Sequence, residues 1–398
     1  MDSKFSFKAG KVSKGTSARA GVITTPHGII STPAFSPVAT RASVRALDNE
    51  DLLDTKSQVV LANTYHLYLR PGVEVIEKFG GFGPFMKWDG PTITDSGGYQ
   101  VSFLWDKGKG QGEENGARVV SISDSGAKFQ SHIDGSLHLL TPEKSMSIQK
   151  VLGADIIMAL DQPLGEGISE KKAKEAFART LKWEERSYVA WKKQEESRKD
   201  GTFQALYGIT QGGTDEKLRR QSLDFVLKTG FCGIAIGGES IGSDPEVTAK
   251  TLDTIVDLLP SDKPVHALGL GGGPEGIFEA VERGIDTFDN TGITRMARCG
   301  LLFIYPEDGG KKGNKFRVDI GKKIYASDEK PISKLCDCYA CRNFSRAYVH
   351  HLVVSGEILG LRLTTIHNIH FINDLMKRIR ASIVDNNFSE LKKYWLTN

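Results

Sequence analysis

Residues 155–161 read Asp-Ile-Ile-Met-Ala-Leu-Asp, an apolar run with an acid at each end. Seven more short runs, rich in apolar and β-branched residues, recur along the chain at 32–38, 58–62, 91–94, 205–209, 233–236, 264–268 and 285–288. Their length and composition are typical of buried β-strands. The sequence therefore predicts eight strands before residue 290.

Segments of helical character separate several of these runs. Thr141 is a suitable N-cap before Pro142, and Ser169 can cap a long, charged, amphipathic segment over 170–198. We expect further helices over 245–259 and 274–283. Alternating strands and helices indicate a parallel sheet covered by helices, and eight such units favour an α/β fold of the (β/α)₈ TIM-barrel type. An open, doubly wound sheet is the alternative.

Two other segments bear on the architecture. The glycine-rich turn at 269–273 follows a strand, as a dinucleotide-binding turn does, but it comes late in the chain, so this signal is weak. Between about 104 and 140, turn signals at 124–126 and 134–135 predict β-hairpin structure inserted into the barrel.

Composition and charge set the broad class of the protein. The 398 residues are 39% hydrophobic and 25% charged, which is typical of soluble globular proteins. No apolar run is long enough to span a membrane and residues 1–5 lack a signal-peptide core, so we expect a cytoplasmic protein without membrane contact. The net charge is only +3, but basic residues cluster at 311–323 and 377–380. These clusters fit either contact with a nucleic-acid backbone or an ordinary solvated surface.

Three of the five cysteines fall within six residues, as Cys336, Cys338 and Cys341, and His367 follows on a segment of helical pattern. Three thiolates and one imidazole are a ligand set for tetrahedral zinc. Because they fill all four positions and leave none for substrate, they indicate one structural Zn²⁺ ion. Free cysteines or a disulfide are the weaker alternatives at this spacing.

Polar residues stand where several of the predicted strands end. They are Asp95, Asp161 and Asp289, together with Gln211 and Gly238. Strand ends of a barrel converge on one face, which is where barrel enzymes place their active sites. Each Asp alone fits a helix N-cap or turn, but the set in register favours a site. Carboxylates with amide and backbone donors suit a guanine-like base, and Tyr99 could stack on it or pack in the core.

The order of these motifs over nearly the whole chain resembles that of the tRNA-guanine transglycosylases. The resemblance is carried by the segments 63–67, 95–100, 208–213, 235–238 and 288–289, by the cysteine cluster with His367, and by 346–348 with 350–352. The family fold is a TIM barrel with an inserted zinc-binding subdomain near the C-terminus. The resemblance therefore implies a catalytic barrel over 1–305, with an N-terminal β extension, and a zinc-binding subdomain with closing helices over 306–398.

The resemblance also implies an activity and a role for each matched residue. The enzyme would exchange guanine at wobble position 34 of GUN-anticodon tRNAs for a 7-deazaguanine, through a covalent glycosyl-enzyme intermediate. Asp289 matches the nucleophile and Asp95 the general acid/base. The matched base-binding residues are Ser96, Gly97, Gly98, Tyr99, Asp161, Gln211 and Gly238, and the matched RNA-binding residues are Thr294, Arg295, Met296, Ala297 and Arg298. A homodimer is expected from the family.

Several neighbours of these residues depart from the usual family pattern. They are Pro163, Glu239, Leu268 and Asn290. Since these positions border the part of the pocket that takes the 7-substituent, both preQ1 and queuine stay open as the incoming base. Two other functions are kept as alternatives: a non-catalytic tRNA-binding subunit and a DNA-modifying relative. The intact Asp95 and Asp289 argue against the first of them.

Overall fold

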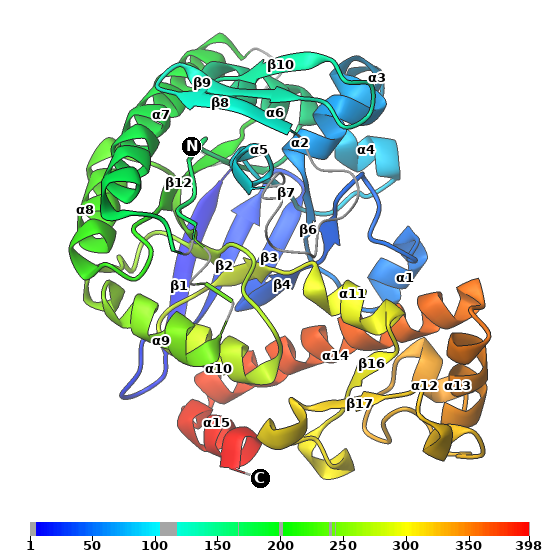
Figure 1. Ribbon diagram of the computed structural model, residues 1–398. Helices are drawn as coiled ribbons and strands as arrows, with labels where there is room; N and C mark the ends of the chain where they lie inside the picture. Colours follow the sequence, from blue (N-terminus) through cyan, green and yellow to red (C-terminus); the bar gives the residue numbers. More distant parts are fainter. Residues whose placement is uncertain are drawn as a thin grey trace.

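The computed structural model describes residues 5–103, 118–165, 167–198, 202–238, 241–242 and 244–397. Its central feature is a parallel sheet in the order β4-β15-β14-β13-β12-β11-β7-β6-β5 (Figure 1). The strands are β4 (Ala34–Ser36), β5 (Val38–Ala39), β6 (Val60–Ala62), β7 (Thr92–Thr94), β11 (Ile156–Met158), β12 (Ala205–Thr210), β13 (Gly233–Ile236), β14 (Val265–Ala267) and β15 (Thr287–Asp289).

The sheet is closed. β4 and β5 are two halves of one predicted run, separated at Pro37, and they pair with β15 and β6 respectively. The two ends of the sheet therefore meet in a single stretch of chain, which makes eight strand positions around a ring. This confirms the predicted TIM barrel and rules out the open sheet, because a doubly wound sheet has two free edges.

Helices surround the ring of strands, as the alternating sequence pattern predicts. They are α1 (Asn49–Asp54), α2 (Thr64–Leu67), α3 (Val73–Lys78), α4 (Phe82–Met86), α5 (Gly98–Phe103), α6 (Pro142–Leu152), α7 (Glu170–Ser197), α8 (Glu216–Thr229), α9 (Pro245–Asp253), α10 (Pro274–Glu282) and α11 (Gly292–Arg298). Thr141 and Ser169 are N-caps, as predicted. Within the described ranges, we find no helix with both the length and the apolar character that crossing a membrane requires.

One predicted helix is shorter than expected. The helix predicted over 245–259 ends at Asp253, and a 3₁₀ turn over Val256–Leu258 follows it. The break lies at Ile255, whose backbone has a φ of −133° and leaves the helical conformation. Periodicity alone did not reveal that limit.

A small antiparallel sheet closes the amino-terminal end of the barrel. It consists of β1 (Ser6–Val12), β2 (Arg19–Thr25) and β3 (Gly28–Thr32), and its Ile23 and Ile30 pack into the interior of the barrel. Asp155, just before β11, accepts hydrogen bonds from the backbone of Thr92 at 2.8 Å and from that of His27 at 3.3 Å. A ligand therefore reaches the barrel interior from the opposite, carboxyl end of the strands.

The insertion after β7 forms the expected antiparallel structure. Its strands β8 (Arg118–Ser123), β9 (Gly126–Gln130) and β10 (Leu137–Leu140) pair as two successive hairpins, and both turns lie at the predicted turn signals. The first part of the predicted insertion, 104–117, lies outside the described residues.

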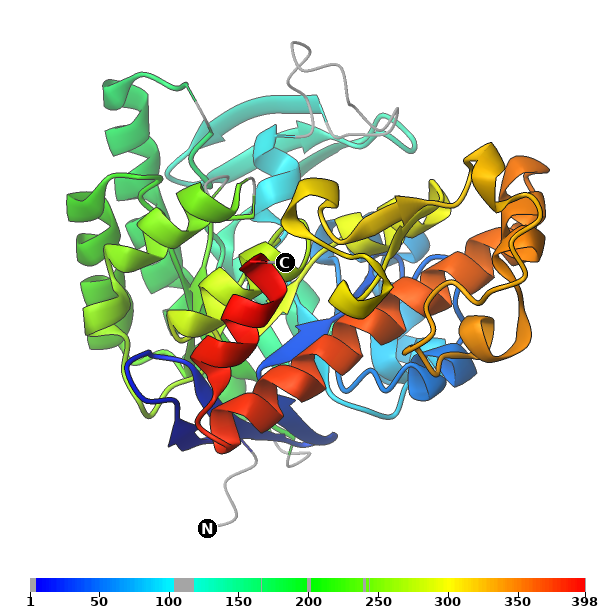
Figure 2. The same cartoon turned by 90° about the horizontal axis from the view of Figure 1, so that it is seen from below.

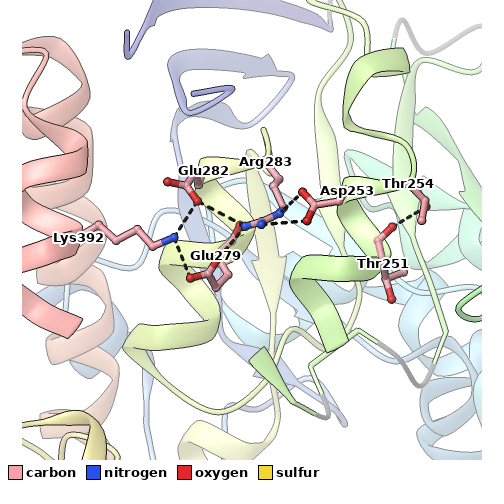
Figure 3. A network of polar contacts seen from close by, with 7 residues as sticks. All are labelled: Thr251, Asp253, Thr254, Glu279, Glu282, Arg283 and Lys392. Atoms are coloured by element: carbon pink, nitrogen blue, oxygen red, sulfur yellow. Dashed lines mark hydrogen bonds and ion pairs between the residues drawn. The ribbon is translucent and has the colours of Figure 1, made fainter. Parts of the chain in front are cut away.

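The rest of the chain packs against one side of the barrel. It contains β16 (Leu301–Phe303), β17 (Arg317–Asp319), α12 (Tyr339–Asn343), α13 (Arg346–Val354), α14 (Ile358–Val384) and α15 (Phe388–Thr397). The long helix α14 runs along the barrel, and α15 turns back beside its end (Figure 2). Lys392 of α15 lies 2.7 Å from Glu279 and 2.7 Å from Glu282 of α10, a network that Arg283 extends to Asp253 (Figure 3).

Candidate active site and metal centre

A pocket of about 530 Å³ opens at the carboxyl ends of the barrel strands. The predicted polar residues that line it are Asp95 after β7, Asp161 after β11, Gln211 after β12, Gly238 after β13 and Asp289 at the end of β15. Each is thus placed by a different strand of the rigid barrel. The sequence predicted that residues at the strand ends lie close together, and in the structure these five residues line one pocket.

Asp95 is a half-buried carboxyl group in the pocket, held by several donors. Its Oδ1 accepts a hydrogen bond from the backbone N–H of Thr64 at 2.8 Å, and its Oδ2 accepts from Asn63 and, at 3.4 Å, from Gln100. Burial raises the pKa of Asp95 to about 7, and the negative charge of Asp289 adds to the increase. Near neutral pH this group can therefore both donate and accept a proton.

Asp161 lies deeper in the pocket and is oriented by two neighbours. Its Oδ1 accepts a hydrogen bond from Ser96 Oγ at 3.1 Å, and its Oδ2 accepts from Gln211 Nε2 at 2.7 Å. Burial raises the pKa of Asp161 to about 6, although both of these hydrogen bonds oppose the increase. At pH 7 most of the population is therefore a carboxylate with a fixed direction, suited to accept N–H groups from a ligand.

Two glycines allow this close packing. A Cβ on Gly98 would come within 2.4 Å of the backbone oxygen of Asp161, and a Cβ on Gly237 would come within 2.7 Å of Gln211 Nε2. Gly98, predicted as a base-binding residue, lies behind the pocket wall rather than in it, whereas Gly97 lines the pocket. Any larger residue at either position would displace the groups that face the ligand.

Asp289 also lines the pocket, and it is buried to 9% exposure. Its Oδ1 accepts a hydrogen bond from the backbone N–H of Gly269 at 3.0 Å, and His266 Nε2 lies 3.3 Å from the same oxygen. The next residue, Asn290, donates to the carbonyl oxygen of Leu270 at 2.6 Å and so ties the end of β15 to the loop after β14. These hydrogen bonds fix the direction in which the carboxylate of Asp289 faces the pocket.

The remaining pocket predictions can be placed as well. Tyr99 lines the pocket and is 50% exposed, so it is not a core residue. Of the four departures from the family pattern, Pro163, Leu268 and Asn290 line the pocket. Glu239 lies outside the described residues.

The predicted RNA-binding residues form most of α11, beside the pocket. Arg295 is exposed, while Met296 and Arg298 are half-buried. Thr294 and Ala297 are buried, so their side chains serve the packing of the helix. Of the five, only the arginines offer charge to a phosphate backbone.

The two basic clusters differ in how the fold uses them. The lysines of the cluster at 311–323 are exposed, and Lys312 forms an ion pair with Glu275 at 2.7 Å. In the cluster at 377–380, Arg378 pairs with Asp374 at 2.7 Å and Arg380 donates to a backbone carbonyl at 2.7 Å. The second cluster is therefore largely committed to packing, and the first is the better candidate for RNA contact.

The cysteine cluster is a candidate metal centre. The ligand atoms of Cys336, Cys338, Cys341 and His367 are all buried and lie within 4.8 Å of one another. His367 Nδ1 lies 3.3 Å from Cys341 Sγ and 3.7 Å from Cys338 Sγ. A tetrahedral ion with bonds of about 2.3 Å to sulfur and 2.0 Å to nitrogen would separate these atoms by about 3.5 Å. The described ligand set thus fits one metal ion.

The histidine of this group is oriented for metal binding. His367 Nε2 lies 2.7 Å from the carbonyl oxygen of Phe303, which can only accept, so Nε2 carries the proton and the Nδ1 lone pair faces the sulfurs. A residue that the sequence did not single out, His370, lies on the same helix. Its Nδ1 is 3.5 Å from Cys336 Sγ and its Nε2 is 2.9 Å from Asp337.

Other residues of the site also escaped prediction from the sequence. Asn63 and Gln100 were noted within motifs, but nothing marked them as the donors that hold Asp95. His266 gave no signal, because a single histidine in an apolar strand is more often a core residue. Glu184 of α7 is fully buried and accepts a hydrogen bond from the backbone of Ile209 at 2.5 Å. Only the fold brings these residues to the site.

A closed parallel barrel with buried carboxylates around a pocket at its strand ends defines a TIM-barrel enzyme. The model of one protein family, described as queuine tRNA-ribosyltransferase, matches residues 13–398. The chain is 42% identical over 390 residues to the queuine tRNA-ribosyltransferase of Desulforudis audaxviator, covering 98% of this chain and 97% of that protein. The corresponding protein of Desulforamulus reducens is 43% identical over 389 residues, with the same coverage.

A third relative, the queuine tRNA-ribosyltransferase of Acetivibrio thermocellus, is 41% identical over 382 residues, which are 96% of this chain and 94% of that protein. Each match extends over nearly the full length of both proteins. The chain belongs to the queuine tRNA-ribosyltransferase family.

Proposed function

We propose that this enzyme exchanges guanine at position 34 of GUN-anticodon tRNAs for a 7-deazaguanine, in queuosine biosynthesis or salvage. The observation that carries this proposal is the pairing, in one pocket, of an oriented carboxylate with a carboxyl group of raised pKa. Asp289 presents an oriented carboxylate at the pocket surface, while the pKa of Asp95 is raised to about 7. A nucleophile and a proton shuttle are what base exchange at a ribose carbon needs.

In the first half of the reaction, a carboxylate oxygen of Asp289 attacks C1′ of the target ribose. The C1′–N9 bond breaks, its electron pair goes to the guanine, and the protonated Asp95 supplies the proton that neutralises the leaving base. An ester between Asp289 and the ribose remains. The attack comes from the face opposite to the base, so the configuration at C1′ is inverted once.

The second half reverses these roles. The ionised Asp95 takes the proton from N9 of the incoming base, and the resulting electron pair attacks C1′. The C1′–O bond of the ester breaks, and its electron pair returns to Asp289 as a carboxylate. Two inversions give net retention, as in retaining glycosidases with a nitrogen base in place of water.

Asp161 and its neighbours supply base recognition. A carboxylate that is fixed by Ser96 and Gln211 accepts from the N1–H and N2–H edge of guanine, which the deazaguanines share. The Gln211 amide uses one N–H on Asp161 and keeps a second for O6, where the backbone N–H of Gly238 can also donate. The exposed ring of Tyr99 then covers the face of the base.

The ion in the candidate metal centre is proposed to be zinc. Three buried thiolates and an imidazole oriented by Phe303 form a closed ligand set, which indicates a structural ion without an open position for substrate. The ion would fix the loop carrying the three cysteines to α14. The bond-breaking chemistry stays with Asp95 and Asp289.

We also propose a homodimer and a cytoplasmic location. Next to the metal centre, the rings of Tyr339, Phe344 and Tyr348 are in contact, with centroid distances of 5.7 and 5.4 Å, and both tyrosines are exposed. An exposed aromatic cluster of this kind suits a protein interface. The cytoplasmic location is supported by the tRNA substrate. Light scattering of the purified protein tests the dimer, and the variant Tyr348→Ala should shift it toward monomer.

The function is tested by incorporation of labelled guanine into a transcribed tRNA with a GUN anticodon. A transcript in which guanosine 34 is replaced by adenosine is the matched control. Time-dependent label in the first RNA only is the expected result, and tight binding without incorporation would instead support the tRNA-binding subunit. Label entering duplex DNA in place of tRNA would support the DNA-modifying alternative.

The incoming base is tested in the same assay by competition. The pocket wall for the 7-substituent includes Pro163 and Leu268, which are apolar and set its shape. Unlabelled preQ1 and queuine are added separately at matched concentrations, and the base with the lower inhibitory concentration is the preferred substrate. Both bases failing to compete while guanine exchanges would refute the deazaguanine part of the proposal.

A further inference from the structure

A fully buried histidine lies directly behind the proposed nucleophile. His266 is on β14 and pairs in register with Thr287 on the neighbouring strand β15, two residues before Asp289. Its Nδ1 lies 2.9 Å from Thr287 Oγ1, and its Nε2 lies 3.3 Å from Asp289 Oδ1. One ring thus connects a buried hydroxyl to the carboxylate that the mechanism uses.

The partners of the ring decide which nitrogen carries the proton. A carboxylate can only accept, so Nε2 must carry a hydrogen to bond with Asp289 Oδ1. In the neutral ring Nδ1 is then an acceptor, and the hydroxyl of Thr287 can donate to it. Asp289 therefore sets the tautomer in which His266 donates toward it, and the hydroxyl of Thr287 fits this tautomer as a donor to Nδ1.

The two oxygens of Asp289 are consequently not equivalent. Oδ1 receives the backbone N–H of Gly269 as well as the His266 ring, while no hydrogen bond from the described residues reaches Oδ2. An oxygen with two donors is a weaker nucleophile than one with none, because its electron pairs are already engaged. We propose that His266 is a positioning residue that, together with Thr287, directs Oδ2 of Asp289 at C1′ and stabilises the carboxylate when the ester breaks.

This proposal rests on the proposed function and predicts opposite effects on the two halves of the reaction. A donor to Oδ1 stabilises the free carboxylate more than the ester, in which that oxygen is an uncharged carbonyl. When Oδ2 leaves C1′ with the bonding electron pair, the negative charge is shared with Oδ1. The N–H of His266 stabilises it there through its hydrogen bond. Loss of the donor should slow ester breakdown and make it rate-limiting, so ester accumulates while turnover falls.

A purely structural histidine makes a different prediction. If His266 only fills space in β14, an apolar ring of similar size should keep turnover, or should lower turnover and ester together by loss of folded enzyme. The amount of ester at steady state separates the two readings, because only the positioning role raises it.

The experiment compares His266→Phe, His266→Gln and Thr287→Val with wild type in guanine exchange. His266→Phe should lower kcat by about ten- to a hundredfold, the range for a lost hydrogen bond to a charged group, and KM for tRNA should fall as well, because slow ester breakdown leaves more of the enzyme as ester. The RNA-linked fraction on a denaturing gel, at fixed guanine and tRNA concentrations, should rise. The amide of His266→Gln can place its N–H near the position of Nε2, so kcat should return to within about threefold of wild type.

Thr287→Val keeps the shape of the side chain but removes the hydroxyl that bonds to Nδ1 of His266. It should lower kcat and raise the RNA-linked fraction in the same direction as His266→Phe, and it carries the test if the Phe variant does not fold. The control is Thr251→Val, since Thr251 is also buried and its hydroxyl has no partner in the described part of the chain. Its kcat should match that of wild type.

The proposal is overturned if His266→Phe or Thr287→Val keeps wild-type kcat, or if the RNA-linked fraction falls in proportion to kcat. Equal loss in His266→Gln and His266→Phe would also overturn it. These results require a wild-type enzyme that exchanges guanine. If the wild-type enzyme does not exchange guanine, the proposed function itself fails. If it does exchange guanine but the variants behave like wild type, only the role of His266 fails.

Discussion

Individual aspartates of this barrel have different chemical roles because their surroundings differ. Asp286 is fully buried and receives two hydrogen bonds from Arg19, at 2.9 and 2.6 Å, which makes it part of the fold. Asp95 is half-buried in the pocket with no cation among its hydrogen-bond partners, and its pKa rises to about 7. Asp289 keeps contact with the pocket. The same side chain therefore serves as a structural anion, a proton shuttle and a nucleophile.

The raised pKa of Asp95 predicts how exchange depends on pH. Because its pKa in the folded protein lies above the ordinary value, the carboxyl group keeps its proton up to about pH 7 and loses it above. The first half of the reaction should therefore slow as the pH rises through 7. Single-turnover release of guanine from tRNA, measured between pH 5.5 and about 9, checks this.

The matched variant is Asp95→Asn, which cannot release or take a proton. Its rate should be lower by about a hundredfold or more, and the decrease in rate above pH 7 should disappear. If the wild-type rate is flat across this range, or if Asp95→Asn keeps the same pH profile, Asp95 is not the proton shuttle.

Asp161 predicts a separate effect on base binding. Asp161→Asn replaces one acceptor oxygen with an amide N–H that points at N–H groups of the base, so KM for guanine should rise by about ten- to a hundredfold. Asp124→Asn on the exposed hairpin turn is the control and should keep wild-type KM. A loss of kcat without any change in KM would contradict the assignment of Asp161 to base recognition.

At the scale of elements, the C-terminal helix α15 is fastened to α10 by charge and by packing. Lys392 lies between Glu279 and Glu282 (Figure 3). The buried Trp395 packs against Phe278 with ring centroids 5.9 Å apart. These contacts bring the last helix of the chain back to the barrel. Residues 306–398, predicted to form a zinc-binding subdomain, therefore attach at this point as well as through α14.

Loss of the lysine should loosen this attachment. Lys392→Met leaves Glu279 and Glu282 with Arg283 but without the lysine, and we expect the free energy of unfolding to fall by about 1–2 kcal/mol, as for partly buried ion pairs. Guanine exchange should stay near wild type, since the network lies away from the pocket. Lys393→Met, the exposed neighbour on the same helix, should leave the urea midpoint unchanged. Equal midpoints for the two variants would show that the network adds no stability.

The metal centre joins a loop to a helix, so metal removal should act on stability first. Because the four ligands are buried and close together, loss of the ion leaves unpaired polar groups in the core. Cys338→Ser should lower the metal content found by mass spectrometry and lower the melting temperature. Cys299→Ser, at an exposed free cysteine, is the control. Full metal content and unchanged melting of Cys338→Ser would contradict the assigned ligand set.

At the scale of the whole molecule, the barrel could be predicted because strand-like and helical segments alternate regularly along the sequence. Each short apolar run predicted a strand. The number of these runs, eight, with helices between several of them, favoured a closed barrel. The zinc ligands were also predictable, since Cys336, Cys338 and Cys341 are close in sequence. What the runs could not show is that β4 and β5 divide at Pro37 to close the sheet.

The parts of the site that could not be predicted depend on contacts across the fold. Asn63 and His266 are ordinary residues in the sequence, and they gain a role only because β6, β14 and β15 bring them to Asp95 and Asp289. The cause of the raised pKa of Asp95 is of the same kind. Burial is the largest cause, and the negative charge of Asp289 adds to it.

The most direct test of the account is to locate the covalent bond between enzyme and RNA. Wild-type enzyme is incubated with a short GUN anticodon stem-loop, denatured and digested, and the RNA-linked peptide is sequenced by mass spectrometry. We predict a ribose ester on Asp289, absent from Asp289→Asn, together with loss of guanine exchange in that variant. An ester on Asp95 or Asp161, or full exchange by Asp289→Asn, would contradict the mechanism.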